Sequence, residues 1–234
     1  MAQTVFKRVE MKYIITKAQK QAILVEMEPH MRMDKYGRTV IRNLYFDAGN
    51  YLLIRRSIDK PLYKEKLRLR SYGGDRVFVE LKKKYKKVVY KRRIELEREQ
   101  AMDWLCGRKP CEIRTQITDE IDYFLKYYQT LHPVLFLSYE REAYKTREKS
   151  DFRVTFDDTV LCRQTDLSLG SPPYGQPVLD EGLVLMEIKC SGGVPLWMTN
   201  LLTREKIYKT SFSKYGTAYH KYILPQIKEE KFHV

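Results

Sequence analysis

Apolar and charged residues alternate along several segments of the chain. In one of them Val77, Val79 and Leu81 alternate with Glu80 and Lys82. Because successive side chains of a β-strand point to opposite faces, this pattern places apolar side chains on one face and charged side chains on the other. The same pattern occurs in residues 8–13, 66–70, 90–97, 152–157 and 184–189. The sequence therefore predicts a sheet with one apolar face and one charged face.

Two architectures fit such a sheet. An open antiparallel sheet with a solvated outer face is the commoner arrangement. In a closed barrel, the apolar faces would pack outward against helices and the charged faces would line a wet lumen. Residues 16–27, 99–105, 115–128, 196–206 and 213–223 have helical patterns, with Thr16 and either Thr115 or Thr118 as helix N-caps. These helices could cover the apolar exterior of a barrel.

Length and composition indicate a folded globular protein. The chain has 234 residues, of which 43% are hydrophobic, and we expect one domain over residues 1–234 with a long loop at residues 170–177. No apolar stretch is long enough to cross a membrane, so we expect no membrane span. The four cysteines have neither CxxC spacing nor the density of a disulfide-rich protein, which favours free thiols and a cytoplasmic location.

The net charge of +14 favours polyanionic partners. Nucleic-acid-binding proteins usually carry a continuous basic stripe or a recognition helix. Here the cations recur at alternate positions on many separate strands, often with a carboxylate among them. A ring of such strands would direct cations at one central axis, which suits a compact, highly charged ligand better than a duplex. We therefore expect a phosphate compound as ligand and no specific nucleic acid.

Eight short motifs resemble those of a known family. They are KRVEMKY at residues 7–13, YFD at 45–47, LRLRSYG at 67–73, FVELK at 78–82, YER at 139–141, FRVTFD at 152–157, MEIK at 186–189 and FSKY at 212–215. In this order and spacing they resemble the catalytic domain of the vacuolar transporter chaperone (VTC) family. That family belongs to the triphosphate tunnel metalloenzymes and is related to the CYTH enzymes. The chain is similar to its stand-alone bacterial form.

The resemblance implies a fold, an activity and a metal. The fold would be α+β, with an antiparallel eight-stranded β-barrel that forms a tunnel with a charged lumen, and with helices packed on the outside. The polymerases of the family transfer the terminal phosphoryl group of ATP to a growing polyphosphate chain and release ADP, with Mn²⁺ or Mg²⁺ as the metal. ATP and inorganic polyphosphate or triphosphate are therefore the partners that the resemblance implies.

The same resemblance assigns roles to residues that match the motifs. The catalytic cations would be Lys12, Arg68, Arg70, Lys82 and Lys91, the phosphate-binding residues Tyr139, Arg141, Arg153, Lys189, Ser213 and Lys214, and the metal ligand Glu187. These residue types suit phosphoryl transfer, which needs in-line positioning and neutralisation of charge on nonbridging oxygens. Arginine offers a planar fork for two oxygens, whereas lysine offers a movable point charge.

Simpler roles remain open for some residues. Glu187 could be only an ion-pair partner of Lys189, because both are on the charged face of one expected strand. Most of the lysines in residues 83–87 are expected to lie on an exposed hairpin. Asp157 and Asp158 are expected to end a strand in a turn.

One departure from the related enzymes affects the expected activity. CYTH enzymes commonly begin with Glu-x-Glu-x-Lys, whereas this chain has Arg8 at the first acidic position. The departure favours the polymerase. An inorganic triphosphatase or nucleotide phosphohydrolase of the same fold is the first alternative, because water can replace the acceptor phosphate. A noncatalytic module that binds polyphosphate or RNA is the alternative of a different class.

Overall fold

The computed structural model describes residues 9–86, 88–148 and 150–232, and Arg8 lies outside them. The strands are β1 (Val9–Thr16), β2 (Met31–Met33), β3 (Thr39–Asp47), β4 (Tyr63–Ser71), β5 (Arg76–Tyr85), β6 (Val88–Glu97), β7 (His132–Thr146), β8 (Arg153–Arg163), β9 (Gln176–Pro177) and β10 (Leu183–Cys190). The α-helices are α1 (Lys17–Met27), α2 (Leu52–Ile58), α3 (Arg98–Leu105), α4 (Gln116–Tyr128), α5 (Leu196–Arg204), α6 (Lys214–Ala218) and α7 (Leu224–Phe232). The fold is therefore α+β, as expected.

The chain divides into two compact units, each assembled from separate segments. Unit 1 takes in the described parts of residues 1–40, 139–160 and 179–213. Unit 2 takes in the described parts of residues 41–138, 161–178 and 214–234. Strands β7 and β8 contribute residues to both units. The expectation of one domain over residues 1–234 stays a prediction.

The strands form one sheet with the order β1-β10-β8-β7-β3-β4-β5-β6, to which β2 is added on β7 and β9 on β8. This main path has the eight strands that the resemblance implies. Within the described ranges no ladder joins β6 to β1, so the sheet is open and the expectation of a closed barrel is wrong on this point. The alternation of residues could not decide it, because an open sheet and a barrel share a side-chain period of two and differ only in whether the edge strands pair.

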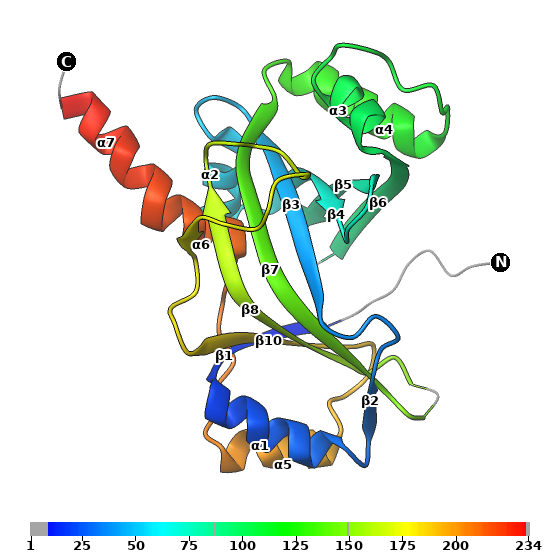
Figure 1. Ribbon diagram of the computed structural model, residues 1–234, viewed down its shortest axis with the longest axis vertical. Coiled ribbons are helices and arrows are strands. Elements are labelled where there is room, and N and C mark those ends of the chain that lie inside the picture. The colour runs from blue at the N-terminus through cyan, green and yellow to red at the C-terminus, as the bar shows by residue number, and fades with distance from the viewer. Residues whose placement is uncertain (1–8, 87, 149, 233–234) are drawn as a thin grey trace. The chain divides into compact units, whose positions relative to one another are not determined.

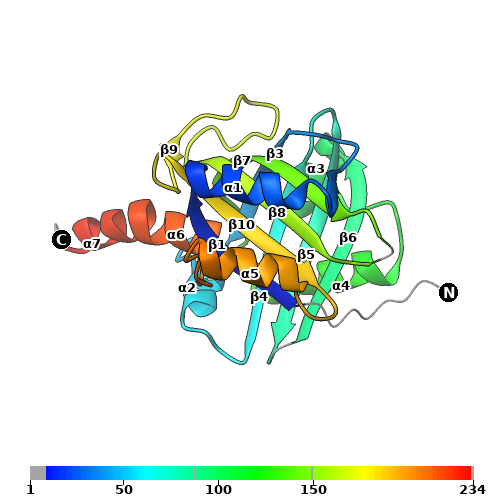
Figure 2. The same ribbon diagram turned by 90° about the horizontal axis from the view of Figure 1, so that it is seen from below.

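In unit 1, α1 and α5 cover the apolar face of β1, β10 and β8 (Figures 1 and 2). Tyr13, Met186 and Phe156 are neighbours across these strands, and all are buried. They pack in one core with Ile23 of α1 and Leu201 of α5. The apolar half of the alternating pattern therefore faces the helices, and the charged half of these strands lies on the opposite face.

In unit 2, α3 and α4 lie beside β5 and β6 and contribute to a second core (Figure 1). Leu69, Val79 and Ile94 are neighbours across β4, β5 and β6 and pack in this core. Trp104 of α3 and Phe124 of α4 are buried in it as well. The core again occupies one face of the strands only, which leaves Arg68, Glu80 and their neighbours on the other face.

The predicted helix starts are confirmed. Thr16 Oγ1 accepts a hydrogen bond from the Gln19 N–H at 3.1 Å, and Gln19 Oε1 accepts one from the Thr16 N–H at 3.0 Å. This reciprocal pair is a capping box, which satisfies backbone donors that the first helical turn leaves open. Thr115 and Thr118 form the same arrangement at the start of α4. The helix expected at residues 213–223 is α6 followed by a π-helical turn, Tyr219–Ile223, and continues into α7.

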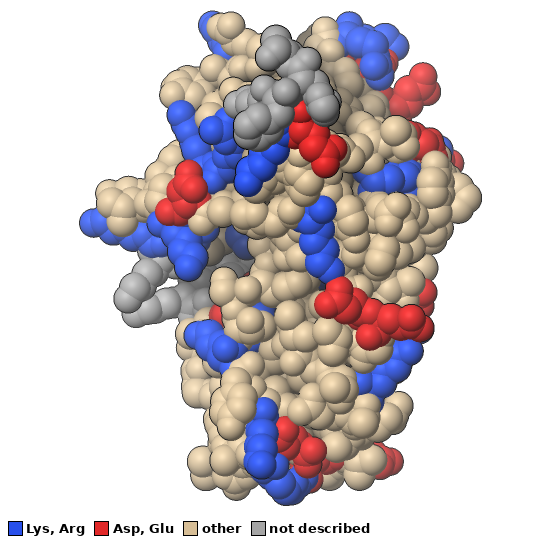
Figure 3. Space-filling model, turned by 90° about the vertical axis from the view of Figure 1, so that its left-hand side faces the viewer, with Lys and Arg blue, Asp and Glu red and all other residues tan. Residues whose placement is uncertain are grey.

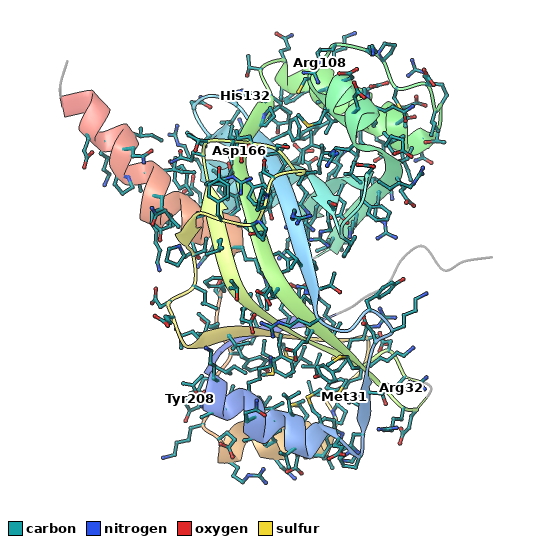
Figure 4. The ribbon with its side chains drawn as sticks, viewed as in Figure 1. Met31, Arg32, Arg108, His132, Asp166 and Tyr208 are labelled. Carbon is teal, nitrogen blue, oxygen red and sulfur yellow. The ribbon has the colours of Figure 1, made fainter. Side chains whose placement is uncertain are left out.

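The expected long loop connects β8 to β10 and contains β9. Arg163 is its anchor: the guanidinium lies 3.5 Å from the centre of the Phe136 ring and 4.2 Å from that of Tyr174, and donates hydrogen bonds to loop carbonyls. Asp166, labelled in Figure 4, accepts a hydrogen bond from the Tyr174 hydroxyl at 2.9 Å. A Cβ atom at Gly175 would lie 2.2 Å from the Cys162 carbonyl oxygen, so only glycine fits there.

All four cysteines have free thiols, which confirms the prediction. In the part of the chain that the structure describes, we find no helix with both the length and the apolar character of a membrane span.

Candidate functional site

Charged side chains are not gathered into one continuous basic stripe on the face shown in Figure 3, where lysines and arginines lie among acidic and uncharged residues. The residues predicted for the site instead gather on the charged faces of the strands. They form two clusters, one in each unit, and each cluster is centred on a buried glutamate.

The cluster in unit 1 is centred on Glu187, whose side chain is 7% exposed. Lys12 Nζ lies 3.4 Å from one carboxylate oxygen of Glu187, and Lys189 Nζ lies 2.8 Å from the other. Arg141 Nη2 lies 3.6 Å from that second oxygen. The strand register explains the contacts, because Lys12 is directly opposite Glu187 and Lys189 is two residues further along the same face. The predicted ion pair of Glu187 with Lys189 is present, and Lys12 and Arg141 contact the same carboxylate.

Asp157 belongs to this cluster, and the expectation that it ends a strand in a turn is wrong. It lies in the middle of β8, opposite Leu185, and its side chain is 0% exposed. Its two carboxylate oxygens accept hydrogen bonds from Arg141 Nε at 2.5 Å and Nη2 at 2.6 Å. A bidentate pair of this kind fixes the plane of the guanidinium. An aspartate is disfavoured in strands unless it is paired, and its partner lies on another strand, so the local sequence indicated a turn.

Lys12 also fixes the chain segment that leads to Ser213. Its Nζ donates a hydrogen bond to the Phe212 carbonyl at 3.0 Å, and its main chain forms a bridge with Thr210. Glu10 lies 3.5 Å from the same Nζ. Ser213 is half-buried and follows this segment directly, so the structure brings it to the neighbourhood of Lys12.

The other two predicted residues of unit 1 have different settings. Arg153 is exposed and lies opposite Lys189, which in turn lies opposite Glu10. These three residues form the row next to that of Lys12 and Glu187 on the same face. Tyr139 is buried at 3% exposure, and the Arg141 guanidinium lies 5.1 Å from the centre of its ring. The ring of Tyr139 therefore packs against the guanidinium of Arg141.

The cluster in unit 2 is centred on Glu80, whose side chain is 2% exposed. Arg68 donates to one of its oxygens from Nη2 at 2.7 Å and from Nε at 2.8 Å. Arg70 Nε lies 3.8 Å from the same oxygen, and Lys91 Nζ lies 2.6 Å from the other. From the sequence we rank Glu80 below Glu187 as a residue that holds metal or orients cations, and Glu80 lies directly opposite Arg68 in the register of β4 and β5.

Electrostatics in this cluster favour the charged carboxylate. Burial alone would raise the pKa of Glu80, but Arg68, Arg70 and Lys91 outweigh it and lower the pKa to about 2. The pKa of Lys91 is lowered, because the effect of burial outweighs that of its contact with Glu80. At neutral pH the site thus holds a negative charge that keeps three cations close together.

Two residues of β3 hold the arginines from the other side. The Tyr45 hydroxyl accepts a hydrogen bond from Arg68 Nη1 at 3.1 Å, and Asn43 Oδ1 accepts one from Arg70 Nε at 3.1 Å. Asn43 is itself fixed, because its amide donates to the Leu137 carbonyl at 3.1 Å. Sequence reasoning assigned no role to either residue. Both are directly opposite the arginines across the β3–β4 ladder, and that register does not follow from the sequence of one strand.

The last two predicted cations lie at the margin of unit 2. Lys82 is exposed and has Lys66 and Lys91 as its neighbours across β4 and β6. Lys214 is half-buried at the start of α6. The next residue, Tyr215, is buried and donates a hydrogen bond to the carboxylate of Asp47 at 3.0 Å, which anchors this end of the helix.

The residues present can hold a divalent metal ion only together with a phosphate compound that supplies further oxygens. Within the described ranges no group of three or more histidine, cysteine, aspartate or glutamate side chains is placed to hold a metal ion. Glu187 and Glu10 both reach Lys12, so one or two carboxylates are available at this point. Mg²⁺ and similar hard ions are commonly held by one or two carboxylates, with phosphate oxygens and water completing the coordination. The donor set of unit 1 fits that arrangement.

Comparison with known proteins places the chain in a family. The VTC domain matches residues 7–223. The chain belongs to the VTC domain family. No curated protein matched this VTC domain.

Solved structures show that this VTC domain shares its fold with proteins described as adenylate or adenylyl cyclase candidates. An adenylate cyclase candidate from Bacillus halodurans has a TM-score of 0.56 and 13% identity, over 90% of this chain and 96% of its own. One from Vibrio parahaemolyticus has a TM-score of 0.50 and 12% identity, over 92% and 98%. An adenylyl cyclase candidate from Hippeastrum, described as having a dominant triphosphatase activity, has a TM-score of 0.52 and 13% identity, over 89% and 93%. At these identities the likeness concerns the fold alone.

Proposed function

We propose that the chain is a polyphosphate polymerase, which transfers the terminal phosphoryl group of ATP to a growing polyphosphate chain and releases ADP. The observation that carries the proposal is the cluster at Glu80, on a chain whose residues 7–223 match the VTC domain. Three cations meet there on one buried carboxylate. Their charges exceed the charge of the carboxylate, so the cluster attracts an anion with several negative charges.

Arg68 and Arg70 would bind the nonbridging oxygens of the phosphate chain. Glu80, Tyr45 and Asn43 hold both guanidinium groups in place before a ligand arrives. Phosphoryl transfer requires little covalent chemistry from the protein, and most of its acceleration comes from positioning and from neutralising charge. Donors that are already oriented need no reorganisation during the reaction, which makes them effective.

Glu187 would hold Mn²⁺ or Mg²⁺ in unit 1, with Glu10 as the second available carboxylate. A bound dication neutralises charge on phosphate oxygens and orients them for in-line displacement. Lys12, Arg141 and Lys189 already contact Glu187, and their ammonium and guanidinium groups would bind phosphate oxygens beside the metal. The metal and the cytoplasmic location stay predictions.

An inorganic triphosphatase is the second candidate function. It is favoured by the fold shared with the Hippeastrum protein, which is described as mainly a triphosphatase. The same cation clusters would serve hydrolysis, because only the acceptor differs: water in place of the terminal phosphate of a chain. The residues described above do not separate these two acceptors.

One experiment separates the candidates. The purified protein is incubated with ATP and Mn²⁺, and the products are assayed as long polyphosphate on a gel and as free phosphate in solution. A polymerase gives long polyphosphate with ADP and little free phosphate. A nucleotide phosphohydrolase gives free phosphate and ADP without polyphosphate, and an inorganic triphosphatase gives free phosphate and pyrophosphate from tripolyphosphate supplied in a parallel incubation. A noncatalytic binding module releases no product from either substrate. Chelation of the metal with EDTA is the control for metal-dependent turnover. Absence of polyphosphate, with or without consumption of ATP, refutes the proposal.

A further inference from the structure

Two of the eight motifs end in buried polar residues to which the proposed mechanism assigns no role. Asp47 ends the YFD motif and Tyr215 ends the FSKY motif. They are 168 residues apart in the chain, yet the Tyr215 hydroxyl donates a hydrogen bond to Asp47 Oδ2 at 3.0 Å. Asp47 is 0% exposed and Tyr215 is 2% exposed. Burial of polar groups is costly unless they are paired, so this contact is a specific feature of the fold.

The Asp47 carboxylate joins three elements of unit 2. Its Oδ1 accepts hydrogen bonds from the N–H groups of Ala48 at 2.9 Å and Leu53 at 2.8 Å. Its Oδ2 accepts one from the Ile54 N–H at 3.0 Å, besides that of Tyr215. Leu53 and Ile54 lie in the first turn of α2, whose N–H groups have no partner within the helix. Asp47 thereby connects the end of β3 to α2 and, through Tyr215, to α6.

The ring of Tyr215 connects this carboxylate to the Glu80 cluster. Its centre lies 4.7 Å from the centre of the Tyr45 ring, and the two ring planes are inclined by 34°. Tyr45 is itself buried and lies two residues before Asp47, on the same face of β3. Its hydroxyl accepts the hydrogen bond from Arg68 Nη1. A continuous row of contacts therefore runs from Asp47 through the two tyrosines to Arg68.

The hydroxyl of Tyr45 gives the Arg68 guanidinium a second fixed point. Nε and Nη2 of Arg68 both donate to one oxygen of Glu80, Oε2. Two bonds that end on a single atom do not by themselves fix the tilt of a guanidinium, unlike a fork that spans two oxygens. The bond from Nη1 to Tyr45 ends on a different strand, so it opposes rotation about Oε2. The orientation of Arg68 therefore depends on where the Tyr45 ring lies.

We propose that Asp47 and Tyr215 are positioning residues for Arg68. They hold the ring of Tyr45, whose hydroxyl in turn orients the guanidinium. The proposal rests on the proposed function and deepens it, because it makes the orientation of Arg68 depend on the docking of α6, whose first residue is Lys214. The same buried pair thus places two cations assigned to phosphate, one on a strand and one on a helix. Such placement matters because phosphoryl transfer depends on donors that are oriented in advance.

The test compares two conservative variants, Tyr215→Phe and Tyr128→Phe. Tyr215→Phe keeps the ring against Tyr45 and removes the hydroxyl that binds Asp47. Tyr128→Phe is the matched control, because the Tyr128 hydroxyl also donates to a buried carboxylate, that of Glu65, at 2.7 Å. Glu65 lies on the face of β4 opposite to that of Arg68, so this bond does not reach the guanidinium. Urea unfolding of both variants shows whether they lose similar stability.

The expected effects separate positioning from stability. Tyr215→Phe should lower kcat about tenfold, less than the about hundredfold that a displacement of about 1 Å can cost, because the ring remains in place. It should weaken the affinity for tripolyphosphate less, by about fivefold, because the transition state depends more strictly on orientation than the bound ligand does. Tyr128→Phe should change neither value by more than about twofold, although it loses a comparable hydrogen bond.

The decisive measurement repeats Tyr215→Phe in an Arg68→Ala background. If Tyr215 acts through Arg68, the further loss in kcat and in affinity for tripolyphosphate should each be less than about twofold. Equal losses in both backgrounds overturn the proposal, and so does an unchanged kcat in Tyr215→Phe or an equal loss in Tyr128→Phe. If the wild type turns over neither ATP nor tripolyphosphate, the proposed function fails. The affinities of the same variants for tripolyphosphate then decide by themselves whether Tyr215 positions Arg68.

Discussion

Replacement of Glu80 with glutamine should destabilise the protein in a way that depends on pH. The glutamine keeps the size of the side chain and removes the charge that holds Arg68, Arg70 and Lys91 together. The pKa of Glu80 is lowered from 4.5 to about 2. At about 1.4 kcal/mol per pKa unit, this difference corresponds to about 3 kcal/mol of folding free energy at neutral pH.

The sign of the effect follows from the direction of the shift. A carboxylate with a lowered pKa in the folded state stabilises the protein above its unfolded pKa, and the contribution is lost as the pH falls through the folded pKa. With the values for Glu80, the contribution is about 3 kcal/mol at pH 7 and about 2 kcal/mol at pH 3.5, and most of it is lost by pH 2. The difference in unfolding free energy between the wild type and Glu80→Gln should narrow in the same way.

Urea denaturation of both proteins between pH 7 and pH 3.5 measures this difference. A matched control is Glu95→Gln, because Glu95 pairs with Arg76 on an exposed part of the neighbouring strand. Exposed pairs contribute about 0 to 1 kcal/mol, so the control should lose little stability at either pH. A Glu80 variant that is as stable as the wild type at pH 7 would show that the carboxylate does not organise the cluster. A loss of the same size at both pH values would show that the cause is packing and not charge.

Three further outcomes are expected. Arg68→Ala and Arg70→Ala should each lower turnover by a factor on the order of 10² to 10³, as loss of an oriented oxyanion donor does, whereas Lys83→Ala should change turnover little. Equal losses in steady-state assays of all three variants would contradict the assigned roles. Triphosphate at a hundredfold excess over Kd should stabilise the folded protein by about 2.7 kcal/mol, and thermal melting in triphosphate that matches melting in chloride of equal ionic strength would refute this. Glu187→Gln should abolish activation by Mn²⁺ while metal-free binding of triphosphate persists or tightens, and an unchanged Mn²⁺ activation curve would remove Glu187 from the metal site.

The sequence predicted which face of each strand is buried better than it predicted how the strands pair. Val77, Val79 and Leu81 are all fully buried, as their alternation predicted, because the period of a strand is a local property. Contacts across strands were not predictable in the same way. Asp157 was assigned to a turn because its partner, Arg141, lies on another strand, and Tyr45 and Asn43 received no role because their support of the arginines depends on the register of β3 and β4. The sequence could not predict whether the sheet closes, because closure depends only on whether the two edge strands pair.

The two clusters differ in charge balance, and the difference bears on how a metal could bind. At Glu80, three cations surround one carboxylate, so phosphate is attracted and a dication is repelled. At Glu187, Lys12, Arg141 and Lys189 are offset by Glu187 itself and by the carboxylates of Asp157 and Glu10. A dication that approaches Glu187 alone would meet three cations within hydrogen-bonding or ion-pairing distance of the same carboxylate. The negative charge of a phosphate chain would both pair with those cations and complete the coordination of the metal, so metal and phosphate should bind to this cluster together more tightly than either binds alone.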